Sequence, residues 1–300
     1  MSTAVLCGGT SGAKVVGGLY RKGVKVGAIV NTADDDYFMG LYVSPDFDSV
    51  LYSLAGIFDF QRNWGIAGDT FRAYEMWKRM GVEPYIMLGD MDLAVHIYRT
   101  YLLRSGVSLS EVFEKLVRSF GISVPIAPPT DSRLTTIVGT EKGEVSFEEY
   151  YVRRLEDKII YIRIIGSDVA KASERALEIL DSSKILIIAP SNPLASVLPI
   201  LSVKEVRKAI EGFRGKRIAV SPFKGGKTYK GPAARMMTDI GLEPGPEGLA
   251  RIYGGLIDYL IVDESDFTRS EINGIKIVPH RIDIQSDEDI QRLYRFILSL

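Results

Sequence analysis

Short runs of apolar residues near both ends of the chain predict the strands of a parallel sheet. These runs occupy residues 5–7, 25–31, 185–189, 217–221 and 259–263. The segments between them place apolar residues at helical spacing, as Val15, Val16 and Leu19 do after the first run. Alternating strands and helices predict an α/β fold, and specifically a Rossmann-like, doubly wound, mostly parallel sheet.

A helical pattern replaces this alternation from about residue 45 to residue 120. Ser44 is a suitable helix cap and Pro45 suits a first helical position. The apolar residues that follow at helical spacing are Phe47, Val50, Leu51, Leu54 and Phe58. Breaks near 81–84 and 106–108, the second with a capping signal at Ser108, divide the later part into separate helices. We expect a helical insertion at 45–120.

Residues 121–164 show a period closer to two, which is typical of strands. Strands are expected at 135–138, 144–147 and 159–164, with a turn at 139–143. This β section would flank or extend a core formed by 1–44 and 165–300. The three parts are expected to pack as one compact unit.

Charge and composition exclude several classes of protein. The chain has 37 Lys plus Arg against 38 Asp plus Glu, a net charge of -1, so no global field draws it to nucleic acid or to an anionic membrane. Its one cysteine, Cys7, excludes an intrachain disulfide and a multi-cysteine metal site, and fits a reducing compartment. No signal-peptide pattern opens the chain, and no run approaches the roughly 18 apolar residues of a membrane helix. We expect a cytoplasmic protein.

The loop after the first predicted strand is a candidate phosphate site. It reads GGTSGAK at 8–14 and leads into a helix, so small residues and backbone amides gather at a helix N-terminus. The loop matches neither Walker A nor GxGxxG. Its alternative interpretation is a tight strand-to-helix connection.

Carboxylates gather after the second predicted strand. Asp34, Asp35 and Asp36 follow it, and Asp46 and Asp48 lie in the first turn of the next helix. Oxygen ligands of this kind suit a hard cation such as Mg²⁺ held together with substrate phosphates. The alternative is a solvated loop and a carboxylate that complements the helix dipole.

Two later loops also follow strands, and one helix face carries polar groups. The PSNP turn at 190–193 presents Ser191 and Asn192, to a nucleotide or merely as a rigid turn. The loop at 221–232 holds three lysines among glycines but fails Walker A, leaving a local anion site or a solvated basic loop. Asp92, His96 and Arg99 share one helix face, where Arg99 suits a phosphate or carboxylate fork.

The histidines and tryptophans give weaker indications of a functional site. A lone His96, with His280 in a late strand, favours neither a histidine metal site nor a Ser-His-Asp triad. Trp64 and Trp77 could stack on a planar ligand, although a helical insertion also needs aromatic core, the role we favour for Trp77.

Taken together, these segments resemble the 2-phospho-L-lactate transferase family of coenzyme F(420) biosynthesis. The matching segments are CGGTSGAK at 7–14, VNTADD at 30–35, SPDFDSVLY at 44–52, WGIAGDTF at 64–71, LGDMDLAVH at 88–96, PSNP at 190–193 and 221–233. They occur in order and span nearly the whole chain.

The resemblance implies a magnesium-dependent enzyme. It would transfer a 2-phospholactyl group from lactyl-2-diphospho-5'-guanosine to the terminal hydroxyl of the deazaflavin Fo and release GMP. Asp48 would orient that hydroxyl and accept its proton, with Asp35 as a second catalytic carboxylate, and Asp34, Asp35 and Asp48 would hold Mg²⁺. The helical insertion, with Arg99 facing the cleft, would cover Fo and exclude water. A homodimer is also implied.

The resemblance further places a set of residues against the substrates, including the guanosine diphosphate portion of the donor. These residues are Gly9, Thr10, Gly12, Lys14, Asn31, Asp46, Val95, Arg99, Ser191, Asn192 and Lys227. Three departures from the family pattern stand out. Val95 replaces the usual Thr that would contact Fo, Ser11 replaces a Gly, and 127–131 matches the PMSDD segment only loosely. Whether the donor carries lactate, pyruvate or glycerate is left open.

Two other functions compete with the transferase. A regulatory protein of the gluconeogenesis-factor type has a similar glycine-rich start and binds nucleotide sugars. The segments at 44–48 and 64–69 favour the transferase over this alternative. A dinucleotide-dependent oxidoreductase would use Asp34 or Asp35 to hold a ribose, although the glycine fingerprint is imperfect.

Overall fold

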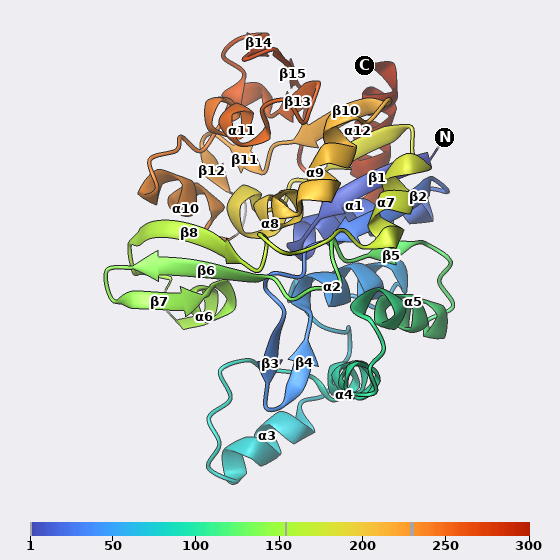
Figure 1. The fold of residues 1–300 in the computed structure, drawn as a ribbon, viewed down its shortest axis with the longest axis vertical. Coiled ribbons are helices and arrows are strands. Elements are labelled where there is room, and N and C mark those ends of the chain that lie inside the picture. Colours follow the sequence, from blue (N-terminus) through green and yellow to red (C-terminus); the bar gives the residue numbers. More distant parts are fainter. Residues whose placement is uncertain (1, 154, 229–230) are drawn as a thin grey trace.

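An eight-stranded sheet forms the centre of the computed structural model, which describes residues 2–153, 155–228 and 231–300 (Figure 1). The strand order across the sheet is β14, β15, β13, β10, β9, β1, β2, β5. Their bounds are β1 Ser2–Cys7, β2 Lys25–Val30, β5 Ile126–Ala127, β9 Ile185–Ile188, β10 Lys216–Val220, β13 Tyr259–Val262, β14 Glu271–Ile272 and β15 Ile275–Pro279. All pairs are parallel except β14 with β15. The predicted α/β class and all five predicted parallel strands are confirmed.

Helices cover both faces of the sheet, which explains why its central strands are mostly apolar. In β1, Val5 and Cys7 face one layer of buried side chains, and Ala4 and Leu6 face the other. The first layer includes α1 (Gly9–Arg21), α2 (Pro45–Leu54), α5 (Leu109–Ser119) and α12 (Asp287–Ser299). The second includes α7 (Glu174–Asp181), α8 (Leu198–Ser202), α9 (Lys204–Glu211), α10 (Ala233–Asp239) and α11 (Pro246–Tyr253).

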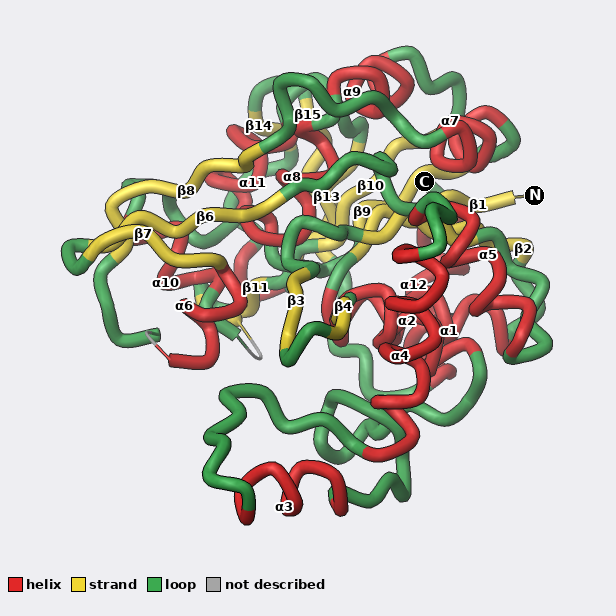
Figure 2. Tube along the Cα trace, turned by 60° about the horizontal axis from the view of Figure 1, so that its bottom comes forward, coloured by secondary structure: helices red, strands yellow, loops and turns green. Residues whose placement is uncertain are grey.

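A short hairpin that the sequence did not reveal, at 36–43, precedes the predicted insertion, which is helical. The insertion contains α2, α3 (Arg72–Arg79), α4 (Asp90–Arg104) and α5, with breaks at the predicted places and a Ser108 capping box on α5. The hairpin consists of β3 (Asp36–Phe38) and β4 (Leu41–Val43) and points toward α3, which lies far from the sheet in both views (Figures 1 and 2). Helix α2 ends at Leu54, before Phe58, because Gly56 takes a left-handed φ of +73°.

The β section contains a small antiparallel sheet beside the core. Its strands are β6 (Thr135–Thr140), β7 (Gly143–Ser146) and β8 (Ile159–Ile165), in the order β7, β6, β8. Helix α6 (Phe147–Arg153) follows β7, and its Tyr150 is fully buried. Strand β5 comes from the same section but pairs with β2 at the edge of the main sheet, so this section both extends and flanks it.

The remaining elements are short. A hairpin of β11 (Phe223–Lys224) and β12 (Lys227–Thr228) follows β10, a π-helical turn occupies Pro193–Val197, and a 3-10 turn occupies Glu264–Asp266. His280, expected in a late strand, directly follows β15. Among the helices of the described residues, none is long and apolar enough to cross a membrane.

Candidate active site

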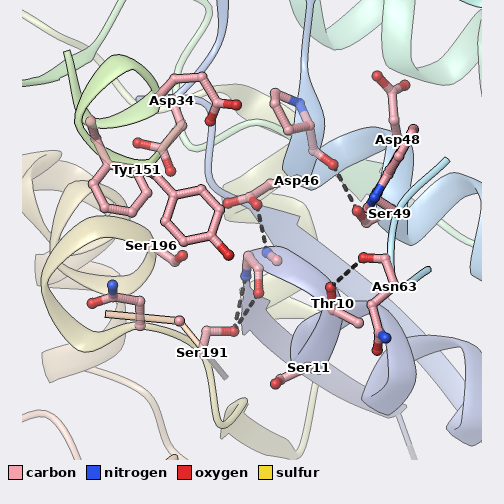
Figure 3. A pocket seen from close by; sticks show the side chains of 18 of the residues that line it. Thr10, Ser11, Asp34, Asp46, Asp48, Ser49, Asn63, Tyr151, Ser191 and Ser196 are labelled. Carbon is pink, nitrogen blue, oxygen red and sulfur yellow. Dashed lines mark hydrogen bonds between the residues drawn. The ribbon is translucent and has the colours of Figure 1, made fainter. Parts of the chain in front are cut away.

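A cavity of about 530 Å³ opens at the carboxyl ends of the central strands, where parallel α/β sheets bind ligands (Figure 3). Its walls include the loops that follow β1, β2, β9 and β10, the start of α2, and α6 of the β section. Strands β1 and β9 are neighbours in the sheet, so their loops meet although they lie far apart in the sequence. Each of the four loops singled out from the sequence contributes at least one residue to the lining.

The glycine loop after β1 is clamped by two side chains. Ser191 Oγ donates to the Gly8 carbonyl at 2.7 Å and accepts from the Gly8 amide at 3.1 Å. The Gly9 amide donates to Asp46 Oδ1 at 2.6 Å. A Cβ at Gly8 would lie 2.2 Å from Asp46 Oδ2, so glycine here is required by space. The first donor of helix α1 is therefore already occupied by a carboxylate.

Five residues of this loop segment, Gly8 among them, line the cavity, and one predicted residue does not. Gly9, Thr10, Ser11 and Lys14 are part of the lining, and Thr10 Oγ1 donates to the Asn63 carbonyl at 2.9 Å. Gly12, expected to contact phosphate, is buried, and a Cβ there would lie 2.6 Å from Cys7 Cβ. Its glycine serves the packing of α1 on β1, which corrects the expectation of direct substrate contact.

Asp34 and Asp46 form an acidic wall together with Glu148. The Asn31 side-chain amide donates to Asp34 Oδ2 at 2.9 Å and to Asp46 Oδ2 at 3.0 Å, which holds the two carboxyl groups side by side. Burial, with the nearby charges of Asp46, Glu148 and Asp35, raises the pKa of Asp34 well above its usual range. Burial also raises the pKa of Asp46 to about 6, and burial with the charges of Asp46 and Asp36 raises that of Glu148 to about 7. Burial and, for Asp34 and Glu148, the neighbouring carboxylates therefore favour the protonated forms of the acids in this wall.

Asp35 points away from this wall. Its Oδ2 accepts from Ser44 Oγ at 2.8 Å and from Tyr42 OH at 3.0 Å, and the residue does not line the cavity. Asp34, Asp35 and Asp48, the three residues predicted to hold Mg²⁺, therefore do not share one surface of the cavity. The structural role visible for Asp35 is to tie Ser44 and Tyr42 together just before α2.

Asp48 lines the opposite side of the cavity and is paired with Arg99. Arg99 Nη1 donates to Asp48 Oδ2 at 3.1 Å, and Nη2 donates to Oδ1. Burial raises the pKa of Asp48, against the lowering effect of the Arg99 charge. Arg99 itself is fully buried and does not line the cavity, so the expectation that it faces the cleft is wrong. The guanidinium is held behind Asp48 because the buried carboxylate needs a counter-charge.

His96 joins Asp48 to a second acid. His96 Nδ1 lies 3.6 Å from Asp48 Oδ2, and Nε2 lies 3.3 Å from Asp92 Oδ1, to which Tyr52 OH donates at 2.5 Å. Asp48, Asp92 and His96 are the described residues whose potential metal-ligand atoms come together, all within 4.8 Å. The predicted helix face of Asp92, His96 and Arg99 is thus confirmed, and it packs against α2.

The remaining predicted residues divide between the cavity and its surroundings. Ser191 and Asn192 line the cavity, and Asn192 Oδ1 also caps the turn that follows by accepting from Leu194 and Ala195. Val95, predicted as a substrate-binding residue, is a buried core residue outside the lining. Lys227 is exposed and does not line the cavity, Lys224 pairs with Asp283 at 2.8 Å, and Tyr229 and Lys230 lie outside the described residues.

Several lining residues were missed by the sequence argument. Glu148, Tyr151 and Phe147 come from α6, and Tyr85, Ile86 and Leu88 come from the segment before α4. None of these residues lies in a loop that directly follows a parallel strand, and ligands were expected to bind mainly at such loops. Of the two tryptophans, Trp64 lines the cavity, whereas Trp77 packs with Phe38 at 6.2 Å between ring centroids, in agreement with the core role predicted for it.

Comparison with known proteins agrees with the resemblance seen in the sequence. A family model described as "2-phospho-L-lactate transferase CofD" matches residues 3–295. Proteins named 2-phospho-L-lactate transferase are 39% identical over 302 residues in Methanopyrus kandleri, covering 99% of this chain and 96% of the relative, and 34% identical over 269 residues in Methanocaldococcus jannaschii, covering 87% and 86%. The relative of that name in Methanosarcina acetivorans is 37% identical over 265 residues, covering 87% and 86%.

Solved structures agree with the fold. Two crystal structures of the Bacillus halodurans protein BH3568, described in one of them as a member of the UPF0052 family, superpose with TM-scores of 0.65 and 0.59. The matches cover 99% of this chain and 98% of the other in the first case, and 97% and 90% in the second. At 16% sequence identity in both, they show a common fold and no more.

Proposed function

Because the chain belongs to the 2-phospho-L-lactate transferase family, we propose that it transfers the 2-phospholactyl group of lactyl-2-diphospho-5'-guanosine to the terminal hydroxyl of Fo. GMP leaves, and the product is the phospholactyl ester of the deazaflavin. The observation that carries this proposal is a single cavity with an acidic wall beside a glycine loop and, elsewhere in its lining, aromatic and aliphatic side chains.

The cavity has a surface for each substrate. Trp64, Tyr85 and Ile86 provide the apolar and aromatic contacts that a planar deazaflavin needs. Gly9, Thr10 and Lys14 would lie along the diphosphate. Ser191 and Asn192, on the neighbouring strand end, would contact the guanosine portion.

Chemically, the Fo hydroxyl oxygen attacks the phosphorus that carries lactate, and the bond from that phosphorus to the GMP oxygen breaks. A carboxylate of Asp48 would orient the hydroxyl and accept its proton. Asp48 is suited to this because it lines the cavity while its counter-ion Arg99 stays behind it. Enclosure of the reactants by the cavity walls would keep water from hydrolysing the donor.

Magnesium is part of the proposal, and Asp34 and Asp46 fit it best. Asp34 Oδ1 is buried and, among the described residues, has no hydrogen-bond partner. Asp34, Asp46 and Glu148 bring carboxylate oxygens, the ligands Mg²⁺ prefers, to one wall of the cavity. A bound Mg²⁺ would neutralise charge that builds up on the donor diphosphate during the transfer.

The test is an assay of purified protein with Fo, the guanylated donor and Mg²⁺, in which chromatography with mass detection follows the deazaflavin. We expect Fo to gain one phospholactyl group, and Asp48→Asn and a chelator each to abolish this. Asp168→Asn, at an exposed acid outside the cavity, is the matched control. Parallel reactions with donors carrying pyruvate or glycerate identify the preferred acid. Unchanged Fo, with retained binding of a UDP-sugar, would instead support a nucleotide-sugar-binding protein.

A further inference from the structure

We propose that Arg99 is a positioning residue that fixes the carboxylate of Asp48 for the transfer and does not contact substrate. This inference rests on the proposed function of the same site. Its structural basis is the two-point contact between Arg99 and Asp48, which join helices α4 and α2.

Arg99 is held on several sides, so its fork has a fixed direction. Its side chain is fully buried, and Nη1 also donates to the Tyr42 carbonyl at 3.3 Å. The guanidinium carbon lies 5.5 Å from the centroid of the Phe47 ring, and Phe47 stacks on Phe113 with centroids 3.6 Å apart. A guanidinium supported in this way presents two parallel donors to a carboxylate in one geometry.

Asp48 needs this support because of its place in α2. It lies in the first turn of the helix, and burial alone would favour its neutral form or a different rotamer. The fork occupies one lone pair on each oxygen and leaves the others for a hydrogen bond from the cavity. A substrate hydroxyl can therefore meet Asp48 in one orientation, which is the condition for rapid transfer.

His96 extends the same arrangement to the second acid. Arg99 Nη1 lies 3.1 Å from His96 Nδ1, and as arginine is only a donor, Nδ1 must accept. The proton of a neutral His96 then lies on Nε2, 3.3 Å from Asp92 Oδ1. Although Asp48, Asp92 and His96 could bind a metal by distance alone, Asp48 already has its counter-charge in the Arg99 cation. The cluster therefore holds the Asp48 carboxylate in a fixed position.

The experiment separates positioning from substrate binding through Arg99→Lys. Lysine keeps the charge but cannot form the fork, so we expect kcat to fall about ten-fold to 100-fold with KM for Fo within two-fold of wild type. Arg104→Lys is the matched control, because Arg104 lies on the same helix but is exposed. A raised KM with unchanged kcat would mean that Arg99 binds substrate, and would overturn the proposal.

A second measurement does not depend on turnover. Arg99→Gln alone leaves Asp48 buried without its counter-charge, so its Tm should fall further than that of the double variant Asp48→Asn with Arg99→Gln. Additive effects of the two substitutions on Tm would overturn the inferred pairing. If wild-type protein shows no transfer to Fo, the proposed function fails, while this thermal comparison still decides whether Arg99 holds Asp48.

Discussion

The Ser191 hydroxyl forms hydrogen bonds with both backbone polar groups of Gly8, donating to the carbonyl at 2.7 Å and accepting from the amide at 3.1 Å. One hydroxyl thus fixes the loop after β1 to the loop after β9. Because Ser191 is buried, water cannot replace these bonds cheaply, and the shape of the glycine loop depends on them.

Ser191→Ala should therefore weaken both the fold and donor binding. We expect a loss of about 1–3 kcal/mol of stability, since two buried backbone groups lose their partner. Affinity for GDP should fall as the loop relaxes. Urea unfolding and calorimetric titration with GDP measure the two effects. Ser105→Ala, which removes an exposed hydroxyl bonded to the Tyr101 carbonyl, should change neither; equal effects of both variants would contradict the clamp.

Gly8→Ala tests the close approach of the loop to Asp46. The added methyl would lie 2.2 Å from Asp46 Oδ2 and 2.7 Å from Ser196 Cβ, so the carboxylate must move. We expect loss of the Asp46 contact to the Gly9 amide and at least a ten-fold drop in kcat/KM. Gly245→Ala is the control, because a Cβ there meets nothing within 4 Å. Full activity of Gly8→Ala would show that the position of Asp46 does not matter.

Glu148 should make stability depend on pH. Its pKa in the folded protein is raised from 4.5 to about 7, so the folded state holds this proton more tightly than the unfolded chain. Its contribution is complete below about pH 4.5 and is lost as pH rises through 7, a change of up to about 3 kcal/mol.

Glu148→Gln removes this dependence. In metal-free buffer the variant should have a higher Tm than wild type at pH 8 and a similar Tm at pH 4.5. Glu141→Gln, at an exposed turn residue of the same β section, should follow the wild-type curve. Parallel curves for wild type and Glu148→Gln across this range would show that Glu148 does not titrate as the structure indicates.

Asp34→Asn should raise stability and remove the response to magnesium. Asparagine relieves the repulsion from Asp46 and still offers an oxygen to the Asn31 amide, so metal-free protein should gain about 1–2 kcal/mol. Millimolar Mg²⁺ should raise the Tm of wild type but not of this variant, because the free Oδ1 is gone. A Mg²⁺ response as large as that of the Asp168→Asn control would place the cation elsewhere.

The fold was predictable where burial leaves a periodic signal. The strand around Val5 is apolar on both faces because helices cover both, and such runs can be recognised in a sequence. The hairpin at 36–43 was not recognised, since its strands have three residues each and no alternation long enough to read.

The site was predictable only as far as strand ends and helix faces determine it. Spacing placed Asp92, His96 and Arg99 on one face, as found, but the carboxylate that covers Arg99 comes from α2. Two adjacent carboxylates also point in different directions. Asp34 lines the cavity, whereas Asp35 accepts a hydrogen bond from Ser44. Glu148 reaches the cavity through the packing of the β section, for which no local pattern exists.

The position of β1 between β2 and β9 has a consequence for the order in which the protein forms on the ribosome. β1 and β2 are both made within the first 30 residues, but the other edge of β1 stays unpaired until Ile185–Ile188 has been synthesised. The glycine loop likewise cannot form its hydrogen bonds to Ser191 until that residue has been synthesised, and the last residue of the cavity lining in the chain is Gln285. A nascent chain therefore exposes an apolar strand edge for more than half of its translation, which makes early capture by a chaperone valuable and makes ligand binding a property of the finished chain alone.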